Sequence, residues 1–207
     1  MGPKLVAGYI MAGGASSRFG EDKALVEIGG SPMLARMIEL MRKVTQSLRI
    51  VARGGAYSGF GVEMVEDRWP GEGPFGGIVS ALEHAATKEP QFEWNLTVSC
   101  DMPFLTEEWL RFLVQRAETS DAEVVLARST SGPEPLCACW RTGAVDTLRP
   151  AFERGVRKVM DGVNLLKAEV LDVQDWKRFD SAGRLFWNMN TRADYEEARR
   201  IIEAERK

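Results

Sequence analysis

The chain has 207 residues, of which 44% are apolar, so it can bury a hydrophobic core, and one domain spanning residues 1–207 is the simplest expectation. Its 27 Lys and Arg residues face 30 Asp and Glu residues, and the formal net charge of −3 supplies no broad basic surface. This balance argues against nucleic acid as the main partner.

Short apolar, β-branched segments alternate with helical patterns along the chain. Apolar residues at helical spacing predict helices after Ser31, around Ile78 and after Thr106, with Ser31 as the N-cap and Pro32 at the first position of the first helix. The predicted strands are Leu5–Ala12, Leu48–Ala52, Val62–Val65, Leu96–Ser99, Glu123–Ala127 and Leu136–Trp140.

This βαβα order predicts an α/β fold, a Rossmann-like three-layer sandwich with a mostly parallel central sheet, parallel at least in its first half. Ligands of such sheets bind beyond the carboxyl ends of the strands. Past Trp140 the pattern loosens, with a candidate strand at Ala168–Val173. The last helix is expected to begin at Thr191, which forms a capping-box pattern with Asp194.

The chain shows no feature of an exported or membrane protein. Its first ten residues are too short and mixed for a signal peptide or a membrane span. Of the three cysteines, Cys137 and Cys139 occupy apparent interior strand positions, which favours reduced thiols. We expect a cytoplasmic protein with no membrane partner.

The most informative segment is Met11–Lys23, directly after the first predicted strand. Gly13 and Gly14 allow the backbone to approach a ligand and to turn successive N–H groups toward phosphate oxygens. Arg18 and Lys23 add compensating positive charge. The segment is not a Walker P-loop, because Lys23 is followed by Ala24 rather than by Ser or Thr.

Met11–Lys23 resembles a signature of the nucleotidyltransferases that activate sugars and cofactors, in particular Leu-Ala-Gly-Gly-x-Ser-x-Arg-x-Gly-x-Asp-Lys of the molybdenum cofactor guanylyltransferases (MobA type), with Met11 in place of Leu. The resemblance implies a nucleotide-diphospho-sugar transferase-like fold. It also implies that this loop wraps the triphosphate and the base edge, and that Lys23 and Arg18 act on the phosphates. Related cytidylyltransferases tend to carry Ala in place of Gly13, which favours guanine. The nucleotide-binding residues implied for the loop are Met11, Ala12, Gly13, Gly14 and Lys23.

Asp101 follows the fourth predicted strand in Ser99–Pro103, a segment that resembles the family's Cys-Asp-x-Pro motif. One carboxylate at a strand end is sufficient for Mg²⁺ when substrate phosphates complete the coordination. We therefore assign Asp101 to catalysis, to nucleotide binding and to the metal. The alternative is a loop aspartate that caps the next turn.

Asp67 closes the third predicted strand, ahead of Pro70–Ile78. This segment resembles the family's Asp followed by Pro-x-x-Gly-Pro-x-Gly-Gly, where the aspartate contacts the guanosine side, so Asp67 is predicted to bind nucleotide. The same glycines spell G-x-G-x-x-G, which keeps an NAD-dependent oxidoreductase open as an alternative, although Pro74 inside the turn disfavours it.

Asn188 and Asn190 precede the last helix, on one face if the segment is a strand. The resemblance implies an Asn near the metal immediately before this helix, which fits Asn190; simple helix capping is the alternative. Downstream of the sixth strand, Arg154, Arg157 and Lys158 could compensate a phosphate-bearing acceptor, or could belong to a solvated helix face.

The resemblance implies that GMP is transferred from GTP to the molybdopterin phosphate, with release of pyrophosphate and with Mg²⁺ as cofactor. GTP and molybdopterin are then the substrates, and molybdoenzymes or their chaperones receive the product. Two alternatives stay open. One is a cytidylyl- or sugar-phosphate nucleotidyltransferase on the same scaffold, and the other is a non-catalytic GTP-binding module that delivers the cofactor.

Overall fold

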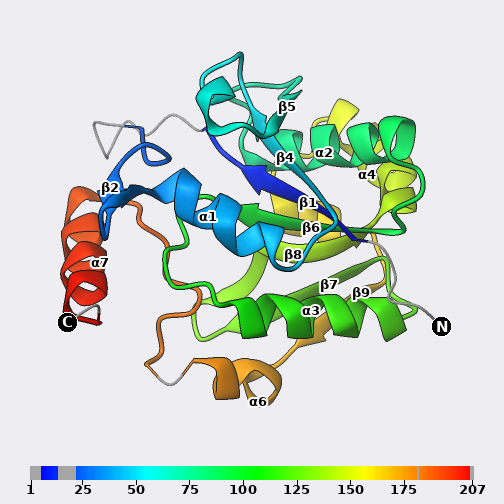
Figure 1. Ribbon diagram of the computed structural model, residues 1–207. Coiled ribbons are helices and arrows are strands. Elements are labelled where there is room, and N and C mark those ends of the chain that lie inside the picture. Colours follow the sequence, from blue (N-terminus) through cyan, green and yellow to red (C-terminus); the bar gives the residue numbers. More distant parts are fainter. Residues whose placement is uncertain (1–5, 14–21, 181, 206–207) are drawn as a thin grey trace.

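A single large sheet organises the computed structural model, which describes residues 6–13, 22–180 and 182–205. Within these residues the sheet has seven strands in the order β5-β4-β1-β6-β8-β7-β9, and a separate short hairpin, β2-β3, precedes the first helix (Figure 1). The strands are β1 Val6–Met11, β2 Glu27–Ile28, β3 Ser31–Pro32, β4 Ser47–Ala52, β5 Glu63–Glu66, β6 Trp94–Ser99, β7 Val124–Ser129, β8 Gly132–Arg141 and β9 Ala168–Leu171.

The first half of this sheet is parallel, as predicted. β1 pairs with β4 and β6, and β4 pairs with β5, all in parallel. β8 runs antiparallel to β6 and to β7, whereas β9 pairs with β7 in parallel. The reversal follows from chain connectivity, because residues 130–131 alone join β7 to β8, and so short a connection permits only an antiparallel hairpin.

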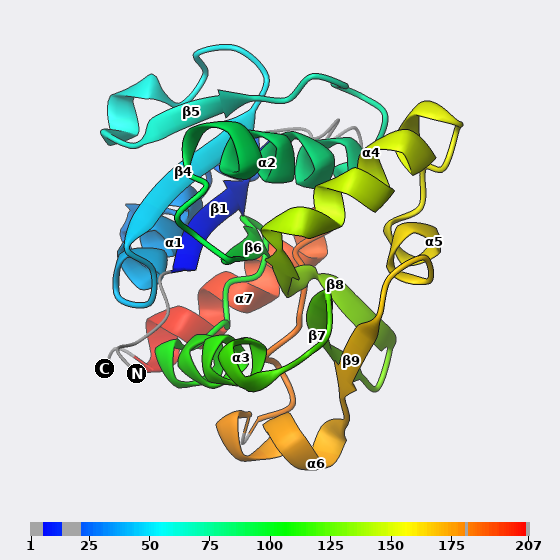
Figure 2. The same ribbon diagram turned by 90° about the vertical axis from the view of Figure 1, so that its right-hand side faces the viewer.

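Helices cover both faces of the sheet (Figures 1 and 2). α1 and α3 pack on one face, and α2, α4 and α5 pack on the other. The predicted three-layer α/β sandwich is therefore confirmed. The helices are α1 Met33–Arg42, α2 Pro74–Lys88, α3 Glu107–Thr119, α4 Val145–Glu153, α5 Val159–Val163, α6 Val173–Trp176 and α7 Arg192–Glu205, with short 3₁₀ turns at Ser58–Phe60, Thr142–Ala144 and Lys177–Phe179.

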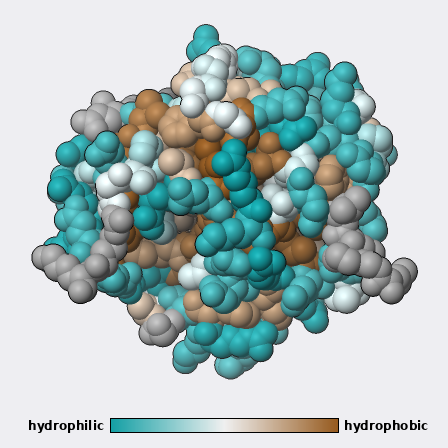
Figure 3. All heavy atoms as spheres, viewed as in Figure 1, coloured by the Kyte–Doolittle hydropathy of each residue, from teal (hydrophilic) through white to brown (hydrophobic). Residues whose placement is uncertain are grey.

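Alternate side chains along a strand pack against the helices on opposite faces of the sheet. In β1, Val6 and Ile10 join the apolar cluster under α1 and α3, whereas Ala7 and Tyr9 pack toward α2. On the face that carries α1 and α3, hydrophilic residues cover most of the surface and apolar side chains show between them (Figure 3). In the described part of the chain, no helix combines the length and apolar character that crossing a bilayer requires.

Two local predictions were wrong. Ser31 is not the N-cap of the first helix: Pro32 is, and Ser31 pairs with Ile28 in the β2-β3 hairpin. The first N–H groups of α1 instead find backbone acceptors, since Met33 donates to the Val26 carbonyl and Leu34 to the Ala24 carbonyl.

The other wrong prediction concerns the segment before the last helix. Residues 186–190 do not form a strand, and the two asparagines have different partners. By contrast, the predicted capping box is present: Asp194 N–H donates to Thr191 Oγ1, and Thr191 N–H donates to Asp194 Oδ2.

Candidate active site

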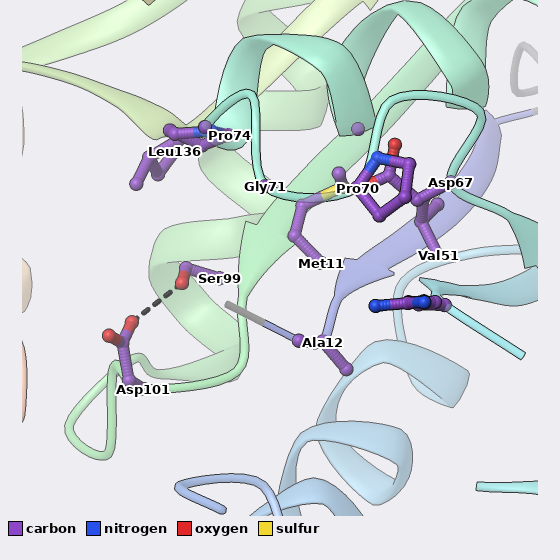
Figure 4. A pocket seen from close by; sticks show the side chains of 14 residues that line it. Met11, Ala12, Val51, Asp67, Pro70, Gly71, Pro74, Ser99, Asp101 and Leu136 are labelled. Atoms are coloured by element: carbon purple, nitrogen blue, oxygen red, sulfur yellow. Dashed lines mark hydrogen bonds between the residues drawn. The ribbon is translucent and has the colours of Figure 1, made fainter. Parts of the chain in front are cut away.

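A pocket of about 630 Å³ lies at the carboxyl edge of β1, β4, β5 and β6. Polar side chains line its two ends, and apolar or glycine residues line the stretch between them (Figure 4). Asp67 stands toward one end, and Ser99 and Asp101 stand toward the other. The lining residues are Met11, Ala12, Gly13, Val51, Arg53, Asp67, Pro70, Gly71, Gly73, Pro74, Gly77, Ser99, Asp101 and Leu136.

Asp101 is the centre of a polar cluster at the β6 end. Lys23 Nζ lies 3.0 Å from Asp101 Oδ2 and 3.0 Å from Asn190 Oδ1. Ser99 Oγ donates to the other oxygen of Asp101 at 2.6 Å. The Lys23 and Asp101 side chains are only 16% and 15% exposed, so their charges interact across little solvent. Three predicted site residues, Lys23, Asp101 and Asn190, are therefore in one cluster, although Lys23 and Asn190 are 167 positions apart in the sequence.

The segment 22–26 positions Lys23 through bonds to its neighbours. Asp22 Oδ1 accepts from Ala24 N–H at 3.0 Å, and Asp22 Oδ2 accepts from the buried Tyr57 hydroxyl at 2.8 Å. The carbonyls of Ala24 and Val26 bind the first N–H groups of α1. The backbone around Lys23 is therefore anchored, while Asp101 and Asn190 hold its ammonium.

The start of α7 positions Asn190. Met189 N–H donates to the Asp101 carbonyl at 2.9 Å, which ties this segment to the end of β6. Asp194 Oδ2 accepts from the N–H of Asn190 and from that of Thr191. Asn188, in contrast, donates its side-chain N–H to the Phe186 carbonyl. Of the two asparagines, Asn190 shares the Lys23 ammonium with Asp101, and its role at a metal stays a prediction.

Asp67 lies at the far end of the pocket, after β5. Its N–H donates to the Ala52 carbonyl at 3.0 Å, which extends the β4-β5 pairing by one step. Its Oδ1 accepts from Trp69 N–H at 3.0 Å, which bends the chain toward α2. The following turn leads into α2, whose N-cap Gly73 and first residue Pro74 line the pocket.

Two glycines, Gly13 and Gly77, line the pocket at positions that suit a residue without a side chain. Gly13 has φ of 105°, a conformation that side chains rarely adopt, and it follows Met11 and Ala12 at the end of β1. A Cβ on Gly77 would lie 2.5 Å from the terminal methyl of Met11, so a larger residue there would displace the flexible Met11 side chain that lines the pocket. Gly14 and Arg18, both predicted to act on the nucleotide, lie outside the described residues.

The N-terminus of α2 has no side-chain cap and faces the pocket through Gly73 and Pro74. Free N–H groups and the helix dipole favour an anion at such a position. Burial raises the pKa of the Cys100 thiol, next to Asp101, so Cys100 stays neutral and adds no negative charge there.

The donor set fits a hard divalent cation. The Asp101 carboxylate and the Asn190 amide oxygen both accept a hydrogen bond from the Lys23 ammonium, so the two oxygens lie near each other, and oxygen ligands are those that Mg²⁺ prefers. Within the described residues, three or more His, Cys, Asp or Glu side chains do not gather into a metal-binding group, here or elsewhere. Protein oxygens that leave coordination positions for phosphate are typical of magnesium–nucleotide sites.

The three predicted acceptor-binding cations do not line this pocket. Arg154 follows α4, and Lys158 precedes α5. Arg157 Nε donates to Glu72 Oε2 at 2.5 Å, and its guanidinium stacks 4.2 Å from the centre of the Phe152 ring. Since Glu72 lies between the pocket residues Gly71 and Gly73, Arg157 is near the pocket rim, and its acceptor role stays a prediction.

Sequence reasoning missed four side chains of this region, namely Ser99, Arg53, Asp22 and Tyr57. Asp22 lay within the recognised motif but had no assigned role. Ser99 ends the fourth predicted strand and begins the segment Ser99–Pro103, but the motif gives it no role. Asp101 lies two positions after Ser99, the last residue of β6, and this spacing is the signal that could have identified Ser99. For Arg53 and Tyr57 the sequence offers no comparable signal.

The glycine turn, the strand-end carboxylates and the partly buried lysine on a Rossmann-like sheet are features of the nucleotidyltransferases. Comparison with known proteins agrees: the model of the MobA-like NTP transferase domain matches residues 8–169. The chain belongs to this family of nucleotidyltransferases, which excludes the dinucleotide oxidoreductase suggested by the Gly71 turn.

Full-length relatives extend the similarity. The chain is 31% identical to a probable molybdenum cofactor guanylyltransferase of Pelotomaculum thermopropionicum, over 96% of this chain and 94% of the relative. It is 30% identical to the molybdenum cofactor guanylyltransferase of Nitrobacter hamburgensis, over 94% and 93%. The crystal structure of molybdopterin-guanine dinucleotide biosynthesis protein A from Archaeoglobus fulgidus superposes with a TM-score of 0.83 at 26% identity, covering 96% of this chain and 99% of that one.

Proposed function

We propose that this protein is a molybdenum cofactor guanylyltransferase that transfers GMP from GTP to the phosphate of molybdopterin in the cytoplasm. An oxygen of the molybdopterin phosphate forms a bond to the α-phosphorus of GTP, and the bond from that phosphorus to the β-phosphate bridging oxygen breaks. Pyrophosphate leaves. The observation that carries the proposal is the convergence of Lys23, Asp101 and Asn190 at the end of a pocket that is large enough for a nucleotide.

Little protein chemistry is needed beyond alignment and charge compensation. The Lys23 ammonium is placed to bind a phosphate oxygen, and the N-terminus of α2 supplies further N–H groups toward anions. Ser99 holds the Asp101 carboxylate in one orientation. A Mg²⁺ ion on Asp101 and Asn190 would supply Lewis-acid polarisation of the phosphoryl group.

The acceptor enters, in this proposal, from the side on which Pro74 and Leu136 face Asp101 and Ser99 (Figure 4). Arg157, held at the rim by Glu72, and its neighbours Arg154 and Lys158 then compensate the acceptor phosphate. The three unpaired, buried cysteines support a reducing, cytoplasmic environment. Molybdoenzymes or their chaperones would accept the product.

Thermal shift with GTP, CTP, ATP and UTP, with and without Mg²⁺, tests the donor, because a ligand of the native state alone raises the melting temperature. We expect the largest shift with GTP and Mg²⁺. A larger shift with CTP would favour the cytidylyltransferase alternative. Binding of GTP without any transfer to molybdopterin would favour the cofactor-delivery alternative.

Asp101→Asn tests the metal. This variant keeps the shape and removes the charge that attracts Mg²⁺, so guanylyl transfer should fall by at least about a hundredfold while the melting temperature changes little. The measurement is radiolabelled GMP transfer as a function of Mg²⁺ concentration. Asp121→Asn, which alters an exposed carboxylate paired with Lys167, is the matched control and should behave as wild type. Near-normal transfer by Asp101→Asn would refute the assignment.

A further inference from the structure

Arg53 lines the pocket beside Asp67, at the edge of the sheet. It follows β4, as Asp67 follows β5, and the parallel register that pairs Ala52 with Glu66 brings the two next residues side by side at the sheet edge. Both line the pocket. Hydrogen bonds fix the backbone on each side of Arg53. Asp67 N–H donates to the Ala52 carbonyl at 3.0 Å, and Gly54 N–H donates to Glu66 Oε2 at 3.2 Å.

The guanidinium of Arg53 is available to a ligand. Among the described residues it makes no hydrogen bond or ion pair, not even with adjacent Asp67. Asp67 uses Oδ1 for Trp69 N–H, and no bond within the described residues engages its Oδ2. A pair of hydrogen-bond donors and a carboxylate acceptor therefore stand side by side at the end of the pocket farther from Asp101.

This end of the pocket suits the base of a nucleotide whose phosphates bind at Asp101. β5 and β6 are separated by three interstrand spacings of about 4.8 Å, or roughly 14 Å in all, because β4 and β1 lie between them. Apolar surfaces of Met11, Ala12 and Val51 line the intervening stretch (Figure 4). A nucleoside triphosphate is long enough to span these two ends.

Guanine matches the Arg53–Asp67 pair best. Its O6 and N7 are two neighbouring acceptors, which an arginine fork binds in bidentate fashion, and its N2 amino group is a donor for a carboxylate. Adenine replaces the O6 acceptor by an amino donor, which would face the guanidinium donor to donor, and cytosine presents an amino donor as well. We propose that Arg53 is a specificity-determining residue that binds the O6/N7 edge of guanine; this assignment rests on the proposed use of GTP.

The test is a set of dissociation constants, measured by calorimetry without the acceptor, for GTP, 7-deaza-GTP, ATP and CTP. 7-Deaza-GTP lacks only the N7 acceptor. Wild type should bind it about tenfold more weakly than GTP, a size typical of one lost hydrogen bond to a charged donor. Arg53→Leu should bind GTP about tenfold to a hundredfold more weakly and no longer distinguish it from 7-deaza-GTP.

Two further variants serve as controls. Arg53→Lys keeps the charge and a donor that can reach N7 but loses the planar fork, so it should bind GTP more weakly than wild type and keep part of the discrimination against 7-deaza-GTP. Arg68→Leu removes a nearby cation that pairs with Glu83 and does not line this pocket, and it should keep the wild-type pattern.

The proposal is overturned if Arg53→Leu retains the preference for GTP over 7-deaza-GTP, or if it weakens GTP, ATP and CTP by the same factor, which would place Arg53 on the phosphates. Failure of the proposed function has a different signature. If wild type binds GTP but transfers no GMP, the proposed function is contradicted, while the binding constants still test the role of Arg53. If wild type does not bind GTP, the proposed function and the role of Arg53 are both overturned.

Discussion

The Ser99 hydroxyl fixes one oxygen of Asp101 and leaves the other toward Lys23. Groups that orient a metal-binding carboxylate typically change metal affinity or activity by 10- to 100-fold when removed. We therefore expect Ser99→Ala to raise the Mg²⁺ concentration that gives half-maximal transfer by about tenfold or more, while transfer at saturating Mg²⁺ falls less. A Mg²⁺ titration of the transfer rate measures both quantities.

A matched serine is available as the control. Ser129 also donates to a carboxylate at 2.6 Å, that of Glu134, away from the pocket lining. Ser129→Ala should leave the Mg²⁺ requirement unchanged, and Ser99→Thr, which keeps the hydroxyl, should recover most of the wild-type response. An unchanged Mg²⁺ requirement in Ser99→Ala would show that Asp101 needs no such support.

At this scale the sequence predicted some of the site and missed the rest for a clear reason. Lys23, Asp101 and Asn190 could be predicted because each lies in a motif at the end of an element. Arg53 follows a strand that carries no recognised motif, and its proposed role in base recognition depends on its position beside Asp67. That neighbour relation is a property of strand pairing, which a single sequence does not specify.

At the scale of elements, the capping box at the start of α7 links helix stability to the site. Thr191 and Asp194 exchange hydrogen bonds, and Asn190 N–H shares the same carboxylate. Loss of an N-cap hydroxyl typically costs about 1 kcal/mol. Thr191→Ala should lower the free energy of unfolding by about that amount and also lower the transfer rate, because Asn190 lies directly before the cap.

Asp172→Ala gives the comparison that separates these two effects. Asp172 forms the capping box of α6 with Asp175, and neither residue lines the pocket. It should cost a similar amount of about 1 kcal/mol in urea unfolding and leave the transfer rate unchanged. Equal effects of both substitutions on the rate would show that general destabilisation, and not the position of Asn190, is responsible.

Where the sequence misplaced the ends of elements, backbone pairing between nearby segments decided the structure in place of the side-chain pattern. The start of α1 uses carbonyls of residues 24 and 26 in place of a side-chain cap, so the Ser31 pattern was misleading. The β7-β8 hairpin was obscured because its polar tip, residues 129–135, interrupts the apolar pattern that marked both strands. Hydrophobic periodicity detects buried strand centres better than solvated strand ends.

At the scale of the whole molecule, a second polar network lies on the α2 side of the sheet. The buried Tyr9 hydroxyl donates to Glu89 Oε2 at 3.2 Å and lies 3.0 Å from His84 Nδ1. Arg49 and Ser47 bind the other Glu89 oxygen, at 2.9 and 2.5 Å. Burial raises the pKa of Tyr9, so its hydroxyl remains protonated, and this network connects β1, β4 and α2.

His84 makes the stability of this network depend on pH. Desolvation lowers the pKa of His84 in the folded protein below its ordinary value near 6.5, more than the nearby Glu89 carboxylate raises it. Between the folded and unfolded pKa values the unfolded chain binds more protons, so the free energy of unfolding rises with pH there. Acidification from pH 7 through about 6.5 and downward should therefore destabilise the protein until the folded pKa is reached.

His84→Gln isolates this effect, because His84 is the single histidine of the chain and Gln keeps a polar side chain beside Tyr9. Urea unfolding at intervals from pH 7.5 to pH 5 should show wild type losing stability relative to the variant as pH falls. Burial also raises the pKa of Glu134, whose contribution has the opposite sign, but it is common to both proteins and cancels in the difference. If the difference in free energy of unfolding between wild type and variant stays constant over this range, the pKa of His84 is the same in the folded and unfolded chains. If wild type instead gains stability relative to the variant as pH falls, folding raises the pKa of His84. Either result would contradict the prediction.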